Sequence, residues 1–397
     1  GTIQIGIGRM EGMSMMPWSS LPEPLKKLFN EVTCGPGSMW APILQEAIQA
    51  HFNKTDKRHF FTCCVSNRKQ CWEGFAESCW DFVHYQVKMC NGDPKEFRRE
   101  GFQIGSPWHG DVIEAPILFL SSNPGITQNC LFPRWHVDEG NFTLGGKSNI
   151  TIAYKDDDGN SVELPNEIAP EEGLYDFFTN RFQESWATKI TAKGYINALL
   201  FKNRKLAGKR CGVSYWRGMH NFMEKFLIES EEKDKDKLSK YKKEYKNLGR
   251  MIMAPVLSAE IVPFGSQREI GVKNNDALLD YCWEKFTCPL LENCGARILV
   301  LVGSLVTDTF GRSLGLQNGT IKVGEPFFYE NVASERYRSK NGEYLVVSVN
   351  HFSAREKDQN YKKAIEELLK SSDVCVKKSL KCAVDETWSL IDGKVTN

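Results

Sequence analysis

The sequence has no long hydrophobic run and almost no net charge. No apolar stretch approaches the roughly 20 residues that a membrane-spanning helix requires, and the 397 residues carry a formal net charge of only +1. We therefore expect no membrane partner. A nucleic-acid partner would have to be recognised by a local cluster of basic residues, because the chain as a whole offers no strong positive field.

Cysteine is present in number but lacks the spacing that cross-links or metal sites need. The thirteen cysteines are an odd count and no two of them form a CxxC pair. Those in the first quarter of the chain fit no common zinc or iron–sulfur pattern. We interpret them as small buried apolar residues and predict no disulfide framework, no metal and no cofactor. Since Gly1-Thr2-Ile3 does not begin a signal-peptide pattern, we expect a reducing, cytoplasmic location.

Hydrophobic residues make up 41% of the chain, enough for a substantial core. In the first quarter they recur at helical intervals, most clearly over residues 72–87, where an amphipathic helix is predicted. Residues 129–190 are predicted to form an insertion or lid, with a β-hairpin around Asp156-Asp157-Asp158-Gly159-Asn160. We predict three regions: an N-terminal helical region (1–105), an α/β domain (106–371) and a C-terminal tail (372–397).

Four short apolar runs predict buried strands. They cover residues 117–120, a run that begins at 259 and stops at Pro263, residues 297–303 and residues 343–349. Helical stretches separate these runs, including one over 277–286 that Asp276 is placed to cap. Strands that alternate with helices favour a parallel sheet covered on both faces. The predicted fold class is therefore α/β, a three-layer αβα sandwich with a central, mostly parallel four-stranded sheet and an N-terminal helical extension.

Polar residues follow or end three of these four strands. Asn123 follows the first strand, Glu260 lies in the second, and His351 follows the last. Pro124 favours extended geometry at Asn123 and leaves its amide available at the strand end. Because parallel strands end at one edge of a sheet, where ligands bind in open α/β folds, we expect these loops to converge over Asn123. His109 also precedes the first strand, although a lone histidine in such a segment is more often a loop or core residue.

Two short motifs resemble those of the uracil-DNA glycosylase superfamily. Leu120-Ser121-Ser122-Asn123-Pro124-Gly125 is similar to the first motif of the mismatch-specific and single-strand-selective branches, in which the asparagine positions the attacking water. His351-Phe352-Ser353 is similar to the second motif, His-Pro-Ser, whose histidine hydrogen-bonds the departing pyrimidine. The resemblance covers residues 106–371, and it implies that Asn123 and His351 are the catalytic residues of a DNA glycosylase.

The resemblance also implies a substrate pocket and a DNA wedge. Ser353-Ala354-Arg355 is similar to the segment that enters the duplex in the mismatch branch, so Arg355 is expected to hold open the gap left by a flipped pyrimidine nucleotide. One of three aromatic residues, Phe132, Trp135 or Phe264, is expected to stack on the base. The substrate-binding residues expected around the base are Ser122, Pro124, Gly125, Glu260, Phe264, Ser266 and Ser353.

The motifs depart from the family pattern at several positions. Ser121 replaces a glycine, Phe352 replaces a proline, and Glu260 stands about where the family often places a base-reading asparagine. A pocket without that amide need not read plain uracil, and the insertion over 129–190 suits a bulkier base. The implied substrate is a damaged or modified pyrimidine, either uracil-type or a hypermodified cytosine such as glucosylated hydroxymethylcytosine, excised in base-excision repair or antiviral defence. Neither motif contains a lysine, so the expected enzyme is monofunctional and leaves an abasic site.

A local basic cluster could contact the DNA backbone. Residues 202–250 contain fifteen lysines and arginines against seven acidic residues, a local balance of +8. Such a run is often only a solvated helix face. Neutralising phosphates nevertheless dominates DNA affinity, so we expect phosphate contacts from five residues of this cluster. They are Lys202, Arg204, Lys205, Lys209 and Arg210.

Two other functions fit the same residues. A catalytically inactive DNA-binding or scaffold protein of the same fold is favoured by the substitutions at Ser121 and Phe352. A nucleoside or nucleotide hydrolase would use the same bond-breaking chemistry on a smaller substrate. An abasic-site assay combined with salt-dependent DNA binding separates the first alternative from a glycosylase, and free nucleosides test the second.

Overall fold

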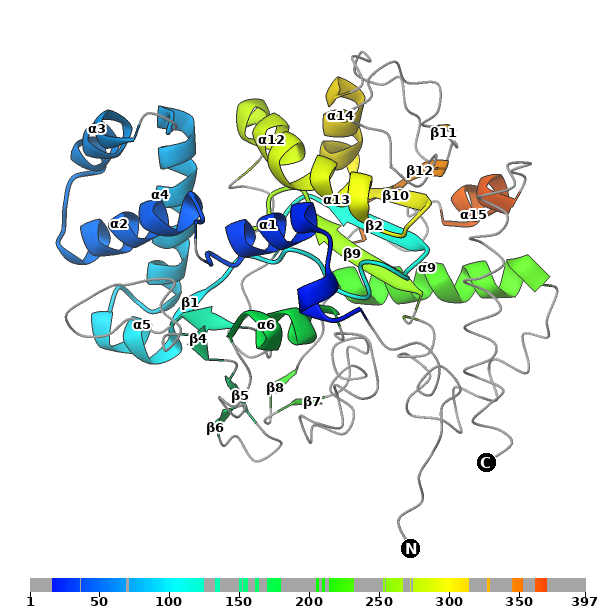
Figure 1. The fold of residues 1–397 in the computed structure, drawn as a ribbon, viewed down its shortest axis with the longest axis horizontal. Coiled ribbons are helices and arrows are strands. Elements are labelled where there is room, and N and C mark those ends of the chain that lie inside the picture. The colour runs from blue at the N-terminus through cyan, green and yellow to red at the C-terminus, as the bar shows by residue number, and fades with distance from the viewer. Residues whose placement is uncertain are drawn as a thin grey trace, which may run out of the picture.

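The structure is a computed structural model of the chain. It describes residues 16–35, 37–68, 71–124, 133–135, 150–151, 153–155, 161–163, 170–179, 205–206, 209–210, 214–231, 253, 255–266, 272, 274–313, 327–328, 345–352 and 361–369. Figure 1 shows a central sheet with helices on both sides and a group of N-terminal helices beside it.

The central sheet contains the four predicted parallel strands. They are β2 (Ile117–Ser121), β9 (Val256–Glu260), β10 (Ile298–Val302) and β12 (Leu345–Val349). The short strand β11 (Phe327–Phe328) pairs antiparallel with β12, so the sheet order is β11-β12-β10-β2-β9. Every position of β2, β9 and β10 is buried, which explains why β2 and β10 are nearly continuous apolar runs and do not alternate between apolar and polar residues.

Helices cover both faces of this sheet, which confirms the predicted three-layer α/β architecture. On one face, α9 (Ser214–Glu231) packs against α15 (Tyr361–Leu369), and the Phe119 ring of β2 lies 5.3 Å from the Phe222 ring of α9. On the other face lie α12 (Asp276–Cys282), α13 (Cys288–Asn293) and α14 (Ser304–Ser313) (Figure 1). A π-helical turn at Trp283–Thr287, η3, joins α12 to α13.

The second strand begins and ends earlier than the sequence predicts. It was expected to start at residue 259 and stop at Pro263, whereas β9 occupies Val256–Glu260. Ile261 and Val262 follow the strand and are fully buried. Their apolar side chains are therefore explained by burial in the core and do not show that they belong to the strand. The predicted cap of the next helix is also displaced by one residue, because the Asn275 side chain, and not Asp276, accepts the hydrogen bond from the backbone of Leu278.

The N-terminal region is helical, as predicted. Helix α4 (Glu73–Met89) confirms the helix expected over 72–87, and both α2 (Trp40–Phe52) and α3 (Lys57–Asn67) contact it. A short antiparallel sheet follows, formed by β1 (Phe102–Gln103), β3 (Arg134–Trp135) and β4 (Ile150–Thr151). The N-terminal helices are η1 (Trp18–Ser20), α1 (Glu23–Val32), α2 (Trp40–Phe52), α3 (Lys57–Asn67), α4 (Glu73–Met89) and α5 (Pro94–Glu100).

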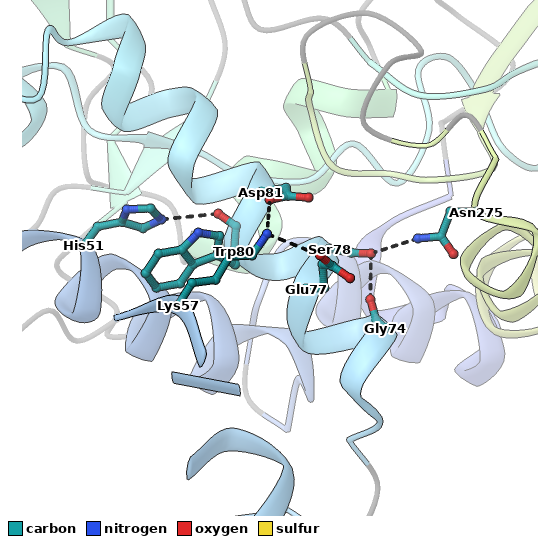
Figure 2. A network of polar contacts seen from close by, with 8 residues as sticks. All are labelled: His51, Lys57, Gly74, Glu77, Ser78, Trp80, Asp81 and Asn275. Atoms are coloured by element: carbon teal, nitrogen blue, oxygen red, sulfur yellow. Dashed lines mark hydrogen bonds and ion pairs between the residues drawn. The ribbon is translucent and has the colours of Figure 1, made fainter. Parts of the chain in front are cut away.

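These helices share one core with the α/β region. The Trp40 ring of α2 stacks on the Phe264 ring, with 4.4 Å between ring centroids, and Phe75 of α4 lies 5.3 Å from Tyr281 of α12. The Asn275 side chain donates a hydrogen bond to the Ser78 hydroxyl of α4 (Figure 2). The core therefore runs continuously from the helices into the sheet.

The remaining described elements lie within or near the predicted lid. Strands β5 (Ala153–Lys155) and β6 (Ser161–Glu163) pair antiparallel, which confirms the hairpin predicted there. Helix α6 is Pro170–Thr179, and β7 (Lys205–Leu206) pairs with β8 (Lys209–Arg210). Among the residues that the structure describes, none belongs to a helix with the length and apolar character needed to cross a membrane.

Candidate functional site

The loop that carries Asn123 is joined to the loop that follows β9. Beyond the strand ends, the backbone amides of Ile261 and Val262 donate to the carbonyls of Ser121 and Ser122, both at 2.9 Å. The Asn123 amide nitrogen then donates to the hydroxyl of Ser266 at 2.7 Å. This hydrogen bond fixes the plane of the Asn123 amide relative to the sheet.

Three of the residues predicted to bind substrate lie beside Asn123. The Ser266 backbone amide donates to the Pro124 carbonyl at 3.3 Å, and Ser122, which precedes Asn123 in the same loop, is buried. Asn123 and Pro124 themselves are partly exposed. Asn123 therefore lies at the carboxyl edge of the sheet, on a loop whose backbone is held by hydrogen bonds both before and after this residue.

His351 lies at the same edge, on the far side of β10. It follows β12, and it packs against Gly303, which follows β10 with a φ of +94°. A β-carbon placed on Gly303 would lie 3.5 Å from both Cβ and Cδ2 of His351. The Gly303 amide also donates to the Val349 carbonyl at 2.8 Å, which keeps the two chain segments together. Glycine suits this position because it adopts positive φ without strain.

Asn123 and His351 thus flank Gly303 across one intervening strand. Neighbouring strands lie about 4.8 Å apart, so the strands β2 and β12 that carry the two residues are separated by about 10 Å. Gly303 places no side chain between them. The strand order therefore places the Asn123 amide and the His351 imidazole on either side of the strand that Gly303 follows.

Glu260 is a buried carboxyl at the end of β9. It pairs in register with Ser121 of β2, and the two side chains therefore share the face of the sheet that α9 covers. Burial raises the pKa of Glu260 to about 8, and a hydrogen bond from Ser106 opposes this rise. Within the described part of the chain, Oε2 of Glu260 has no hydrogen-bond partner.

The segment before β2 supplies two further buried polar residues to this position. The Ser106 hydroxyl lies 2.7 Å from Nε2 of His109, and the backbones of His109 and Ser258 exchange two hydrogen bonds of 2.7 and 2.8 Å. The His109 ring also packs near the rings of Phe178 and Trp216. His109 is therefore a buried member of the cluster around Glu260.

Helix α9 contributes Tyr215 to the same cluster. Burial, together with the nearby Glu260 carboxyl, raises the pKa of Tyr215 above the ordinary tyrosine range. Neither Tyr215 nor Ser106 is adjacent in sequence to a predicted strand end, so no local sequence pattern marks either residue as part of the site. Only the packing of α9 and of the 102–109 segment against the sheet brings them to Glu260.

Phe352 occupies the position where the resembled motif has proline. Its buried ring lies 5.1 Å from Tyr215, 5.6 Å from Tyr361 and 6.1 Å from Phe119. It fits against α9 only because residue 218 is glycine, since a β-carbon there would lie 2.2 Å from the Phe352 ring. The backbone after His351 is thus held by packing in place of a proline ring.

Two of the three aromatic residues expected to stack on a base are core residues instead. Phe264 is 1% exposed and contacts Trp40 and Phe82, which lie against its ring at centroid distances of 4.4 and 5.9 Å. Trp135 is fully buried in β3 beside Phe102. These packing contacts leave neither ring accessible for stacking, which corrects the substrate-binding role predicted for Phe264 and the stacking role considered for Trp135.

Several predicted site residues lie outside the described part of the chain, and for others only the backbone is described. Lys205 is in β7, and Lys209 and Arg210 are in β8. The predicted residues outside the described part are Gly125, Phe132, Lys202, Arg204, Ser353 and Arg355.

No cluster of three or more histidine, cysteine or acidic side chains suitable for a metal ion occurs among the described residues. Buried thiols such as Cys34 and Cys79 have pKa values raised by burial, as expected for cysteines that act as apolar packing residues.

No protein-family model matches the sequence, and no curated protein matches it.

Proposed function

We propose that this protein is a DNA glycosylase that hydrolyses the N-glycosidic bond of a damaged or modified pyrimidine and leaves an abasic site. The observation that carries the proposal is the position of Asn123 and His351, which flank Gly303 at the carboxyl edge of the sheet. The two residues are far apart in sequence, and their place at one edge of the sheet supports a shared role of the kind that the resemblance to the uracil-DNA glycosylase superfamily implies.

The reaction needs a positioned water and stabilisation of the departing base. The amide of Asn123 is held by its hydrogen bond to Ser266, so its oxygen has a fixed direction in which to orient a water molecule toward the sugar carbon. The water adds to that carbon as the bond to the base nitrogen breaks, the electron pair of that bond leaves with the base, and the proton that the water loses neutralises the departed base. Asn123 contributes position and not charge, because an amide does not titrate.

His351 is suited to the charge that develops on the base. A hydrogen bond from its imidazole to a carbonyl oxygen of the pyrimidine would stabilise negative charge as the base departs. Removing one preorganised donor of this kind typically costs about 3 to 4 kcal/mol of transition-state stabilisation. The base must first leave the DNA stack, at a cost of a few kcal/mol that weakly paired or damaged bases lower.

The test is an abasic-site assay on a panel of oligonucleotides, single-stranded and duplex. The panel contains uracil, mismatched thymine, 5-hydroxymethylcytosine and glucosylated 5-hydroxymethylcytosine. We expect cleavage of at least one base by the wild-type protein, no turnover with retained DNA binding for Asn123→Ala, and a loss of about 100- to 1,000-fold for His351→Ala. Asn67→Ala and His59→Ala are matched controls, because both residues are exposed on α3.

Salt-dependent DNA binding without any abasic product would instead support the inactive scaffold with the same fold. Two observations favour that second candidate, namely that Ser121 is a buried serine in place of the motif glycine and that Phe352 is anchored to α9 in place of a proline. Wild-type activity equal to that of Asn123→Ala would exclude the role assigned to Asn123.

A further inference from the structure

Two thiols meet where α3 ends and α4 begins, outside the loops that carry Asn123 and His351. Cys64 belongs to the last turn of α3, and Cys71 precedes the first residue of α4 by two positions. Their sulfur atoms lie 3.5 Å apart, and both cysteines are free thiols. Since a disulfide bond joins its sulfur atoms at about 2.0 Å, the two atoms must approach by only about 1.5 Å to form one.

Helix α3 is held to the rest of the protein by few buried side chains. It lies at the outer edge of the group of N-terminal helices (Figure 1), and only Phe60 and Cys64 of its eleven residues are buried. Phe60 packs against Trp80 of α4, with 5.2 Å between ring centroids. An element with so little buried surface opens locally at a small cost in free energy. A covalent bond at Cys64 would therefore act on one of the two side chains that anchor α3.

The two thiols differ in their access to solvent. Cys71 is 6% exposed, whereas Cys64 is fully buried. A small molecule can therefore reach the sulfur of Cys71 more readily than the sulfur of Cys64. Cys64 needs no such access, because its partner sulfur is already in contact with it.

The surroundings of the two thiols also favour Cys71 as the one that reacts first. The S–H of Cys71 donates to the carbonyl oxygen of Trp72 at 3.6 Å, so its sulfur is placed to accept the S–H of Cys64. Burial raises the pKa of both thiols, but this hydrogen bond raises the pKa of Cys64 further and opposes the rise at Cys71. The positive charge of Arg68, which forms an ion pair with Glu46, also favours the Cys71 thiolate.

We propose that Cys64 and Cys71 are a reversible redox pair, whose disulfide forms by exchange with a small disulfide of the glutathione type and fastens the end of α3 to the start of α4. Disulfides that form in reducing compartments are usually transient and catalytic or redox-sensing. The pair goes beyond the proposed glycosylase function and acts independently of it.

The exchange takes two steps. The Cys71 thiolate attacks one sulfur of glutathione disulfide, the bond between the two glutathione sulfurs breaks, and one glutathione leaves as a thiolate. The Cys64 thiolate then attacks the Cys71 sulfur of this mixed disulfide and releases the second glutathione. The two cysteines lose two electrons and two protons, and these convert one glutathione disulfide into two glutathione thiols.

The experiment equilibrates the full chain in glutathione buffers of increasing disulfide content, blocks the remaining thiols, and maps disulfides by peptide mass spectrometry. The wild-type protein should give a peptide in which Cys64 is linked to Cys71. Amide hydrogen exchange is measured on the same samples. Oxidation should slow the exchange of α3 amides by about 10- to 100-fold, because the bond closes a short loop, and should leave the exchange of β10 unchanged.

Single substitutions distinguish the roles of the two thiols. Cys64→Ala removes the second step, so Cys71 should be recovered as a mixed disulfide with glutathione. Cys71→Ala removes the first step, so Cys64 should stay reduced. The matched control is Cys63→Ala, which removes the partly exposed neighbouring thiol on α3 and should form the same bond with the same slowing of exchange.

Three results would overturn the proposal. The first is a folded wild-type protein in which Cys64 and Cys71 both stay reduced at every glutathione ratio. The second is a linked peptide without slower exchange in α3, which would show that the bond does not fasten this helix. The third is an equal slowing of α3 exchange on oxidation of Cys64→Ala, which would assign the effect to another thiol. The wild-type measurements decide the first two outcomes even if a variant folds poorly.

Discussion

The N-terminal helices and the edge of the sheet bury side chains of opposite character. The helices pack Trp40, Phe75 and Phe82 against one another, whereas the sheet edge buries Glu260, His109 and a set of serines. Apolar burial stabilises the fold directly, but buried polar groups stabilise it little and are costly when their hydrogen bonds are incomplete. The difference indicates that one region supplies stability and that the other gives up stability to keep polar groups at a site.

The largest expected effect tests the stabilising region. Trp40 is fully buried, with Phe75 at 4.1 Å and Phe264 at 4.4 Å between ring centroids. Trp40→Ala should lower the free energy of unfolding by about 3 to 5 kcal/mol, measured by urea denaturation. Val65→Ala is the control, because Val65 is 37% exposed and should change stability little. A loss below 1 kcal/mol for Trp40→Ala would show that the helices do not carry the stability assigned to them.

The second prediction concerns the polar edge and alkaline pH. Because the pKa of Glu260 is raised to about 8 in the folded protein, the folded state holds a proton that the unfolded state has lost. The stability that this proton provides is complete at pH 4 and is lost as pH rises toward 8, with a slope of up to about 1.4 kcal/mol per pH unit. Urea denaturation between pH 5 and 8 should show this decline, and Glu260→Gln should flatten it. An unchanged slope in Glu260→Gln would contradict the buried neutral acid.

The third prediction has the opposite sign and comes from the helical region. Burial against Trp80 lowers the pKa of His51 to about 4, so the unfolded state binds a proton that the folded state excludes. The contribution of the neutral His51 ring to the free energy of unfolding is complete above pH 6.5 and is lost as pH falls toward 4. His51→Gln should reduce this acid sensitivity by less than the Glu260 effect, since His51 is only partly buried. Equal acid sensitivity in both proteins would contradict this account.

The smallest effect is expected from the surface of the helical region. Lys57 of α3 forms ion pairs with Glu77 at 3.3 Å and Asp81 at 3.2 Å on α4 (Figure 2). All three side chains are exposed, so Lys57→Met should change the free energy of unfolding by about 0 to 1 kcal/mol. Thermal unfolding at low and high salt measures this change in stability. A larger loss of stability that depends on salt would mean that these ion pairs help to hold the helices together.

The sheet, and the position of Asn123 and His351 at one of its edges, could be predicted from the sequence better than the lining of the candidate site. Asn123 and His351 could be assigned to one edge because strand ends are marked by the change from apolar residues to polar ones. Phe264 was placed wrongly because it follows Glu260 closely in sequence, while its packing partner Trp40 comes from a distant helix. Ser106 and Tyr215 could not be found for the same reason, since their role depends on tertiary packing that no local pattern encodes.

The aromatic contact at Phe352 links the two halves of the site mechanically. Phe352 directly follows His351, and its ring rests on Gly218 and Tyr215, which both belong to α9. Tyr215 in turn faces Glu260. A small displacement of α9 would therefore move the loop that carries His351 and the surroundings of Glu260 together. A substitution that changes the position of one of these two residues is expected to change the position of the other as well.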